Sequence, residues 1–211
     1  MSTTAKLAAL VLCIATLPGC ISTKFYVDPQ YHQTSYNDLH RLAPPYVLAV
    51  TVEFQRNGQP KPSVDAAIRA DIERSLRASG VVLPYDGTRP ADGQISFVLN
   101  NIADMGAAAA KGFGTGLTFG LAGSHVMDGY EMTVRVTQGA SVTERKYQHA
   151  IHETVGVASA PAGMHAVDAG TAVNQVIDEL VLNCLKDLQA AGVLMPQAPV
   201  QPVAAKPELA T

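Results

Sequence analysis

Alternation of apolar and polar positions predicts strands in five parts of the chain. In the clearest of them, Tyr46, Leu48 and Val50 fall at every second position and so share one buried face. Pro84 lies in a shorter run and restricts that run to a sheet edge, because proline cannot donate a backbone hydrogen bond. The last two strands are separated by a short turn and are expected to form a hairpin. The expected strands cover residues 46–54, 81–85, 94–102, 130–138 and 142–155.

Two other stretches carry apolar residues at intervals of three and four, the spacing of an amphipathic helix. The first is expected to start at Ser63, whose side chain can cap free backbone N–H groups, and to end at Gly80. The second, 166–191, ends before Gly192 and has the longer apolar stripe. Cys184 lies on that stripe and is therefore expected to be a buried, unreactive thiol. The apolar positions of the first helix are Val64, Ile68, Ile72 and Leu76.

The expected elements follow the order β-α-β-β-β-β-α, with a glycine-rich insertion between the third and fourth strands. This order predicts an α+β fold, a two-layer sandwich of two helices packed on a mostly antiparallel sheet. The domain is expected to span residues 46–193. Before it, residues 20–45 form a tether that wraps onto the domain, because its aromatic residues would otherwise be exposed. After it, residues 194–211 form a disordered Pro/Ala tail.

The insertion, residues 105–127, is rich in glycine and poor in charge. On a helix, its glycines at four-residue spacing would form one smooth face, with apolar residues as a ridge beside it. The pattern resembles the glycine-zipper segments of some outer-membrane and pore-forming proteins. The candidate interaction residues in it are Gly112, Phe113, Gly116, Leu117, Gly120 and Leu121.

Three interpretations of the insertion stay open: a membrane span, a loop that contacts a membrane or a partner, and a crossover packed on its own domain. The span is disfavoured because the uncharged run from Gly112 to Met127 has 16 residues, whereas a spanning helix needs about 20. Five glycines in a helix would also cost about 5 kcal/mol relative to alanine. A nucleotide-binding loop is disfavoured too, because the Gly-Lys-Ser/Thr ending is missing.

The first twenty residues have the form of a secretion signal. Lys6 precedes an apolar run, Leu7–Leu17, which is too short to span a bilayer. The run leads into Leu17-Pro18-Gly19-Cys20, which resembles the lipobox of bacterial lipoproteins. The resemblance implies that residues 1–19 are removed and that Cys20 becomes a lipidated N-terminus. The alternative is an ordinary secretory signal in which Cys20 is incidental.

Lipidation would hold the protein at a membrane, since acyl chains contribute roughly 0.8 kcal/mol per buried CH₂. By analogy with lipoprotein sorting, no Asp follows Cys20 to retain the protein in the inner membrane. The resemblance therefore implies an outer-membrane position that faces the periplasm. The expected partners are the membrane and an envelope protein or a second copy of the chain. A formal net charge of −3 indicates no nucleic-acid partner.

Recognisable catalytic and metal-binding motifs are missing from the sequence. His149 and His152 fall on opposite faces of a strand and so cannot share a metal ion; His149 is expected to be partly buried and His152 solvated. Asp104, Asp128 and Glu131 could serve acid–base chemistry, but nothing in the sequence brings them together. We therefore expect no catalytic residue, no metal and no cofactor.

These patterns favour a non-catalytic, lipid-anchored accessory or assembly subunit of the cell envelope. Two alternatives stay open. The domain could bind a lipid or another apolar ligand between its helices and its sheet, which unfilled apolar space there would support. It could also be a hydrolase, which a single cleft holding Asp104, His125, Asp128 and Glu131 would support.

Overall fold

A computed structural model describes residues 23–31, 34–103, 125–155 and 160–196. Its helices are α2 (Pro62–Ser79), α4 (Ala169–Ala190) and a short 3₁₀ helix, η1 (Tyr36–Asp38). Its strands are β1 (Thr23–Val27), β2 (Tyr46–Arg56), β3 (Gln59–Pro60), β4 (Val82–Pro84), β5 (Gly93–Ile102), β6 (His125–Gln138) and β7 (Ser141–Val155). The expected α+β sandwich, with two helices on a mostly antiparallel sheet, is confirmed.

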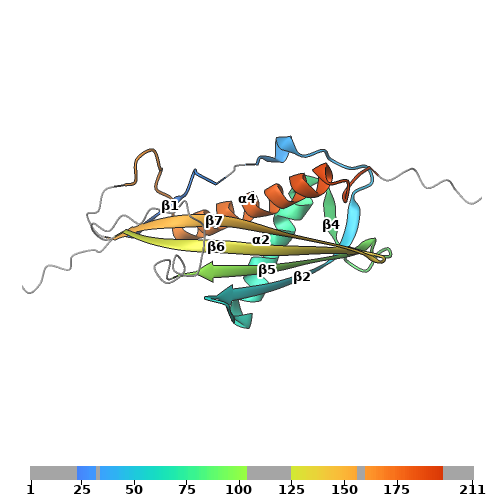
Figure 1. Ribbon diagram of the computed structural model, residues 1–211, viewed down its shortest axis with the longest axis horizontal. Coiled ribbons are helices and arrows are strands. Elements are labelled where there is room, and N and C mark those ends of the chain that lie inside the picture. Colours follow the sequence, from blue (N-terminus) through green and yellow to red (C-terminus); the bar gives the residue numbers. More distant parts are fainter. Residues whose placement is uncertain (1–22, 32–33, 104–124, 156–159, 197–211) are drawn as a thin grey trace, which may run out of the picture.

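The described strands form one sheet in the order β1-β7-β6-β5-β2-β3. β4 pairs with the first residues of β2, whereas β3 pairs with its last residues. The pairs β1–β7, β7–β6, β6–β5 and β2–β3 are antiparallel. β2 runs parallel to both β5 and β4, because α2 carries the chain back across the sheet between them. The long strands follow the long axis of the molecule, and α2 and α4 lie together on one side of the sheet (Figure 1).

The hydrophobic core lies between this helix pair and the sheet. Alternate residues of β5 and β6 point into it, so Phe97 pairs with Val134 and Leu99 with Met132 in the same layer. From the helices, Ile72 and Leu185 are fully buried against them. The opposite sheet face carries polar residues at the intervening positions, which is the pattern of an antiparallel sheet with one solvated face.

Helix α2 does not begin as the sequence indicated. Lys61 occupies the capping position and its side chain makes no capping hydrogen bond, so Ser63 is not the cap. Pro62 takes the first helical position, where its fixed φ suits a helix and its missing N–H costs nothing. At the other end, Gly80 caps the helix in the left-handed conformation, as expected, with φ of 69°.

Three of the differences from the expected elements add residues to the sheet or to the core. Residues 23–27 of the tether form β1 and extend the sheet, although they show no clear alternation. β6 already begins at His125, so residues 125–127 belong to a strand and not to the insertion. Leu194 is fully buried in the core, although the sequence placed it in the tail.

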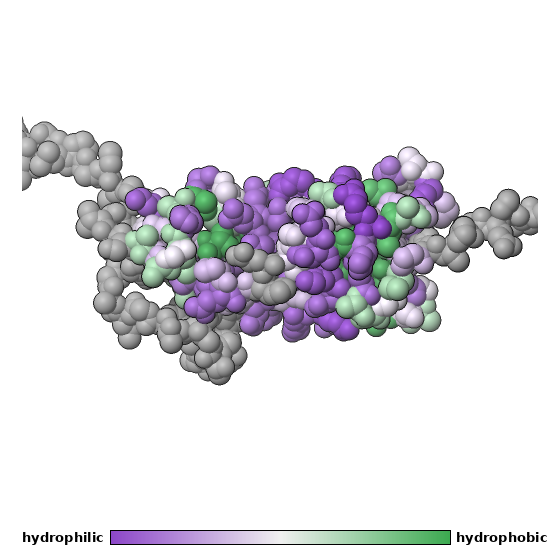
Figure 2. Space-filling model, turned by 90° about the horizontal axis from the view of Figure 1, so that it is seen from above, coloured by the Kyte–Doolittle hydropathy of each residue, from purple (hydrophilic) through white to green (hydrophobic). Residues whose placement is uncertain are grey.

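The two ends of the sheet differ in what they carry. β1 starts at Thr23, at the end of the sheet where β7 finishes. The β6–β7 hairpin lies at the opposite end of the sheet. The hairpin end carries the exposed large apolar side chains of the described residues: Leu83, Tyr85, Val142 and Met195. Figure 2 shows one face of the molecule, with hydrophilic residues over its middle and apolar residues gathered toward both ends.

Candidate functional site

The residues singled out from the sequence as functional lie outside the described part of the chain. These are the lipidation candidate Cys20 and the insertion residues Gly112, Phe113, Gly116, Leu117, Gly120 and Leu121. The described part instead shows a polar network that joins the N-terminal segment to β7 and α4.

Residues 28–31 and 34–45, here called the strap, lie between β1 and β2, and residues 34–45 cross the outer side of α4 (Figure 1). The Thr34 hydroxyl donates a hydrogen bond to Asn183 of α4. Farther along, Gln189 of α4 bonds to both backbone groups of His40: the His40 N–H donates to Gln189 Oε1 at 3.0 Å, and Gln189 Nε2 donates to the His40 carbonyl at 2.5 Å. The strap therefore packs onto the domain, as expected for the tether.

Two leucines of the strap pack into the core. Leu39 and Leu42 are each 6 % exposed and join the core cluster, so the strap covers apolar surface as well as polar groups. This covering is required because α4 is buried on most of its circumference, including Leu182 on the side away from the main stripe. Burial of each leucine side chain stabilises the fold by roughly 2–3 kcal/mol, judged from the free energy of transfer from water to an apolar environment.

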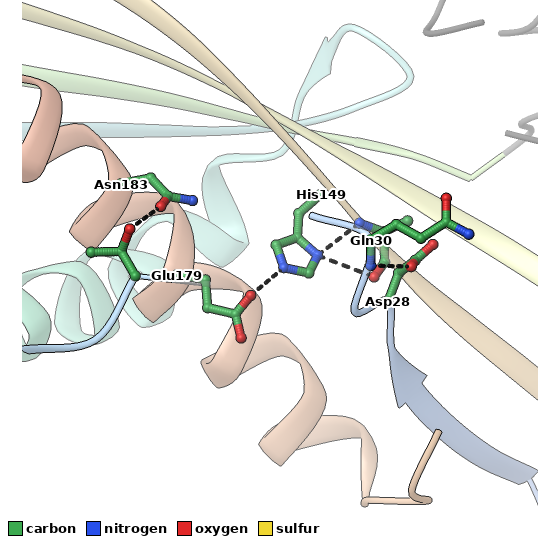
Figure 3. A network of polar contacts seen from close by, with 7 residues as sticks. Asp28, Gln30, His149, Glu179 and Asn183 are labelled. Carbon is green, nitrogen blue, oxygen red and sulfur yellow. Dashed lines mark hydrogen bonds and ion pairs between the residues drawn. The ribbon is translucent and has the colours of Figure 1, made fainter. Parts of the chain in front are cut away.

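A buried histidine lies where the strap leaves the sheet. His149 is fully buried, and its Nε2 lies 2.6 Å from Oε2 of Glu179 on α4 (Figure 3). Its Nδ1 lies 2.8 Å from the Ala150 nitrogen and 3.2 Å from the Ala150 carbonyl oxygen. The shorter contact makes Nδ1 the acceptor of the Ala150 N–H, so Nε2 carries the proton and donates it to Glu179. Tyr31 of the strap stacks on the imidazole, with ring centroids 4.9 Å apart. Both ring nitrogens are therefore bonded within the fold, and the imidazole has no exposed surface.

A second histidine is paired on the opposite sheet face. His152 Nε2 lies 2.9 Å from Oδ2 of Asp28, and Asp28 also accepts the Gln30 N–H at 2.9 Å. Asp28 is only 1 % exposed. The two histidines thus bond to separate carboxylates on opposite faces. His152 is not solvated as expected, because the strap brings Asp28 over it, and His149 is more deeply buried than expected.

Cys184 is the free cysteine of the described residues, and it is buried on α4 as expected. Burial raises the pKa of its thiol to about 12, partly offset by a hydrogen bond with Tyr147. The pKa of Tyr147 is also raised, chiefly by burial and then by the nearby Cys184 and Asp187. The Tyr147 hydroxyl donates to Asp187 at 3.0 Å. The thiol is therefore kept protonated at neutral pH and is not a nucleophile.

The carboxylates proposed for a hydrolase do not come together where they are described. Asp128 lies on the helix-facing side of β6 and Glu131 on the opposite side, because the two are an odd number of residues apart. Burial raises the pKa of Asp128, while Arg56 and Asn101 act against this shift. Asp104 and the side chain of His125 lie outside the described residues. Within the described part, no three His, Cys, Asp or Glu side chains are placed to hold a metal ion.

Among the described residues, a surface hollow is found away from the place expected for an apolar ligand. Between helices and sheet, side chains such as Ile72, Leu99 and Leu185 have no exposed surface, so this region is packed. A hollow of about 470 Å³ instead opens beside the end of α4. We call it the apolar hollow; its lining residues are Asp38, His40, Leu42, Lys186, Gln189, Ala190, Leu194, Met195 and Pro196.

Sequence reasoning missed this network because its parts are far apart and follow no period. Asp28 and His152 are 124 positions apart, and Thr34 and Asn183 are 149 apart. One signal was available: His149 falls on the apolar face of its strand, and a buried imidazole needs a polar partner. Glu179, which borders the apolar stripe of α4, was the natural candidate.

No protein-family model matches the chain, and neither does any curated protein sequence. Among solved structures, the chain is similar to a PelC dodecamer subunit from Paraburkholderia phytofirmans, with 12 % identity, a TM-score of 0.35, and coverage of 80 % of this chain and 98 % of that one. It is also similar to protein XCC0632 from Xanthomonas campestris, with 9 % identity, a TM-score of 0.33, and coverage of 77 % and 93 %.

A third similar structure is a putative lipoprotein from Caulobacter crescentus, with 12 % identity, a TM-score of 0.29, and coverage of 66 % of this chain and 85 % of that one. Likeness at this level says nothing about function. Independently of it, the helices of the described residues are too short or too polar to cross a membrane.

Proposed function

We propose that the protein is a lipid-anchored, non-catalytic interaction subunit of the cell envelope, held at the outer membrane on its periplasmic side. The observation that carries the proposal is the position of Cys20, three residues before β1 begins at Thr23. A fully extended chain reaches at most about 3.6 Å per residue, so three residues reach about 11 Å. A lipid on Cys20 would therefore keep one end of the sheet close to the membrane.

The same sheet end holds both junctions of the glycine-rich insertion. β5 ends at Ile102, which pairs with Gly129, and β6 begins at His125, which pairs with Thr154 next to the Thr23–Val155 pair. The insertion thus leaves and re-enters the sheet at the end that Cys20 would anchor. This supports an insertion that contacts the membrane or a membrane-borne partner, through Gly112, Gly116, Gly120 and the apolar residues beside them.

A non-catalytic role fits the chemistry of the described side chains. Both nitrogens of His149 are bonded, Cys184 is protonated and buried, and Asp128 and Glu131 lie on opposite faces. The strap adds a positive reason, since it fixes the anchored segment to β7 and α4 through Asp28, Tyr31 and Thr34. A fixed connection of this kind suits a subunit that must be held in one orientation on a membrane.

The proposal is tested by changing Cys20 to Ser in the full chain and fractionating the envelope. We expect the wild type to fractionate with outer membranes and to carry a mass increment of a diacylglyceryl and an amide-linked acyl group on Cys20. The Cys20→Ser variant should be found in the soluble fraction. Cys13→Ser, in the part expected to be removed, is the matched control and should behave as wild type. A wild-type chain without lipid on Cys20 contradicts the proposal.

A further inference from the structure

One long edge of the sheet is only partly paired. β1 covers residues 151–155 of β7, and Asp28 donates its N–H to the Ala150 carbonyl, but no described strand lies beside residues 142–148 on that side. We call residues 142–148 the open edge of β7. In an antiparallel ladder every second residue of an edge strand points its N–H and C=O away from its neighbour. Because Ala150 points outward, the outward residues of the open edge are Val142, Glu144, Lys146 and Gln148.

Space for a further strand is present beside the open edge. A hollow of about 560 Å³ lies there, and Tyr31, which follows β1, is part of its lining. Glu131 and Gln148 line it from the solvated side of the sheet, and Tyr147 and Asp187 line it from the helix side. Because both sides contribute, the hollow lies along the edge of β7 itself. A row of unpaired backbone groups with space beside it is a template for another strand.

The charges of the open edge are complementary to those of a second copy that runs in the opposite direction. Arg145 is the middle residue of the open edge, so antiparallel pairing centred on Arg145 uses its whole length. In that register Glu144 lies opposite Lys146 of the partner subunit, and Lys146 lies opposite Glu144 of the partner subunit. A slip of two residues would instead place Glu144 opposite its own copy or Lys146 opposite its own copy, and like charges directly opposite are destabilising. The length of the edge and its charges therefore select the same register.

We propose that two copies of the chain pair through their open edges, antiparallel and centred on Arg145, and so join two sheets into one. Glu144 can keep its ion pair with Arg135, at 2.7 Å, while it meets Lys146 of the partner subunit. Arg145 limits the affinity for two reasons. It faces its own copy, and its guanidinium donates at 2.9 Å to the Glu144 carbonyl, an outward group that the partner strand needs. A small contact of this kind gives a weak, concentration-dependent dimer.

The inference goes beyond the proposed function, since it rests on the open edge alone and holds with or without a lipid on Cys20. It also fixes a geometry for anchored copies. Antiparallel pairing places the two Thr23 residues at opposite ends of the dimer, because each lies where its own β7 finishes. Both copies can therefore be anchored in one membrane only with their strands lying along the membrane plane.

Sedimentation equilibrium of the full chain carrying Cys20→Ser measures the association without any contribution from a lipid. We expect a monomer–dimer equilibrium. Glu144→Lys and Lys146→Glu each bring like charges together at both ends of the register, and each should weaken the dimer about tenfold. An equimolar mixture of the two variants should dimerise again, because every cationic position then faces an anionic one. Lys61→Glu makes the same charge change beside β3, at the opposite edge of the sheet, and is the matched control that should leave the dimer unchanged.

Two further readouts separate edge pairing from association through another surface, and circular dichroism verifies that each variant is folded. As the concentration rises, amide exchange should slow severalfold at the outward residues 142, 144, 146 and 148. It should stay unchanged at residues 143, 145 and 147, whose N–H groups already bond to β6. Arg145→Thr should tighten the dimer severalfold, because it removes both the like-charge contact and the competing hydrogen bond to Glu144.

Three outcomes overturn the proposal. A chain that stays monomeric at the highest attainable concentration shows that the open edge does not pair. A dimer whose protected amides lie outside residues 142–148 uses another surface, and so does a dimer that mixing the two charge variants fails to restore. Failure of lipidation at Cys20 would change none of these readouts, so the two proposals fail separately.

Discussion

The imidazole of His149 lies between two groups that come from distant parts of the chain, the Glu179 carboxylate at 2.6 Å and the stacked ring of Tyr31. Fully buried and bonded at both nitrogens, it connects β7, α4 and the strap at one point. Removing Glu179 leaves the buried His149 N–H without its acceptor, which costs more than the hydrogen bond itself contributes.

We expect Glu179→Ala to lower the free energy of unfolding by about 1–3 kcal/mol, because the His149 N–H loses its acceptor in a dry site. Glu179→Gln keeps an acceptor oxygen and should cost clearly less. Urea unfolding followed by circular dichroism measures both. The control is Glu73→Ala on α2, which loses only its ion pairs with the exposed side chains of Arg69 and Arg77. An equal loss for Glu73 and Glu179 would contradict the special role of the buried His149–Glu179 pair.

One glutamine of α4, Gln189, attaches the strap to this helix through two hydrogen bonds. Gln189→Ala removes both hydrogen bonds to the His40 backbone, so we expect a loss of about 1–3 kcal/mol and faster amide exchange in residues 34–42. Gln94→Ala, on the exposed side of β5, is the matched control and should change neither quantity. Unchanged exchange in the strap of the Gln189→Ala variant would show that the other contacts of the strap, those of Leu39 and Leu42 among them, hold it in place without Gln189.

We expect the buried thiol of Cys184 to make the free energy of unfolding decrease at alkaline pH. The pKa of its thiol is raised to about 12 in the fold, above its ordinary value near 9, so the folded state holds the proton more tightly than the unfolded state. The stabilisation is therefore complete below pH 9 and is lost progressively as the pH rises from 9 toward 12. Tyr130, whose pKa burial raises to about 12, adds a loss in the same direction above pH 10.

Urea midpoints between pH 7 and 11 should show this decline, and Cys184→Ala should reduce its slope. The same burial predicts that iodoacetamide at pH 8 modifies Cys184 only after unfolding, which mass spectrometry can follow. Rapid modification of the native chain would contradict both expectations.

Two features disfavour any side chain at position 80: the left-handed backbone of Gly80 and the nearby side chain of Arg41. Its φ is 69°, and a Cβ atom there would lie 2.7 Å from Nε of Arg41 on the strap. We expect Gly80→Ala to cost about 1–2 kcal/mol for the left-handed backbone, plus a smaller part for displacing the flexible arginine. Gly139→Ala, with φ of 57° and open space around it, isolates the backbone cost. If the two variants lose equal stability, Arg41 contributes nothing to the constraint.

The glycine-rich insertion offers a test of the proposed membrane end. Gly116→Leu with Gly120→Leu would obstruct the smooth face and should reduce cross-linking to an envelope partner in intact cells. Folding of the domain should be unaffected, because both junctions of the insertion are fixed by the β5–β6 and β6–β7 pairs. Unchanged capture and membrane contact would leave a purely structural crossover.

The elements that the sequence predicted well are those in which one period governs a whole segment. The stripe through Ile68, Ile72 and Leu76 and the alternation through Ile95, Phe97 and Leu99 each reflect one buried face, and so helices, strands and hairpin were correctly expected. β1 was not predicted, because Phe25 and Tyr26 are covered on different faces of the sheet and so show no alternation. The pairings of His149 and His152 were not predicted. His152 bonds to Asp28, 124 positions away in the sequence, and His149 bonds to Glu179 in the helix layer.

The antiparallel pairing of β1 with the end of β7 has a mechanical consequence. Hydrogen bonds between antiparallel strands run perpendicular to the strands, and Thr23 lies at the outer end of β1. A pull from an N-terminal anchor along the strand axis would load the β1–β7 bonds together in shear and would not peel them one by one. Shear geometry resists force best, so this corner of the sheet would bear tension well if the proposed anchor at Cys20 pulled on it.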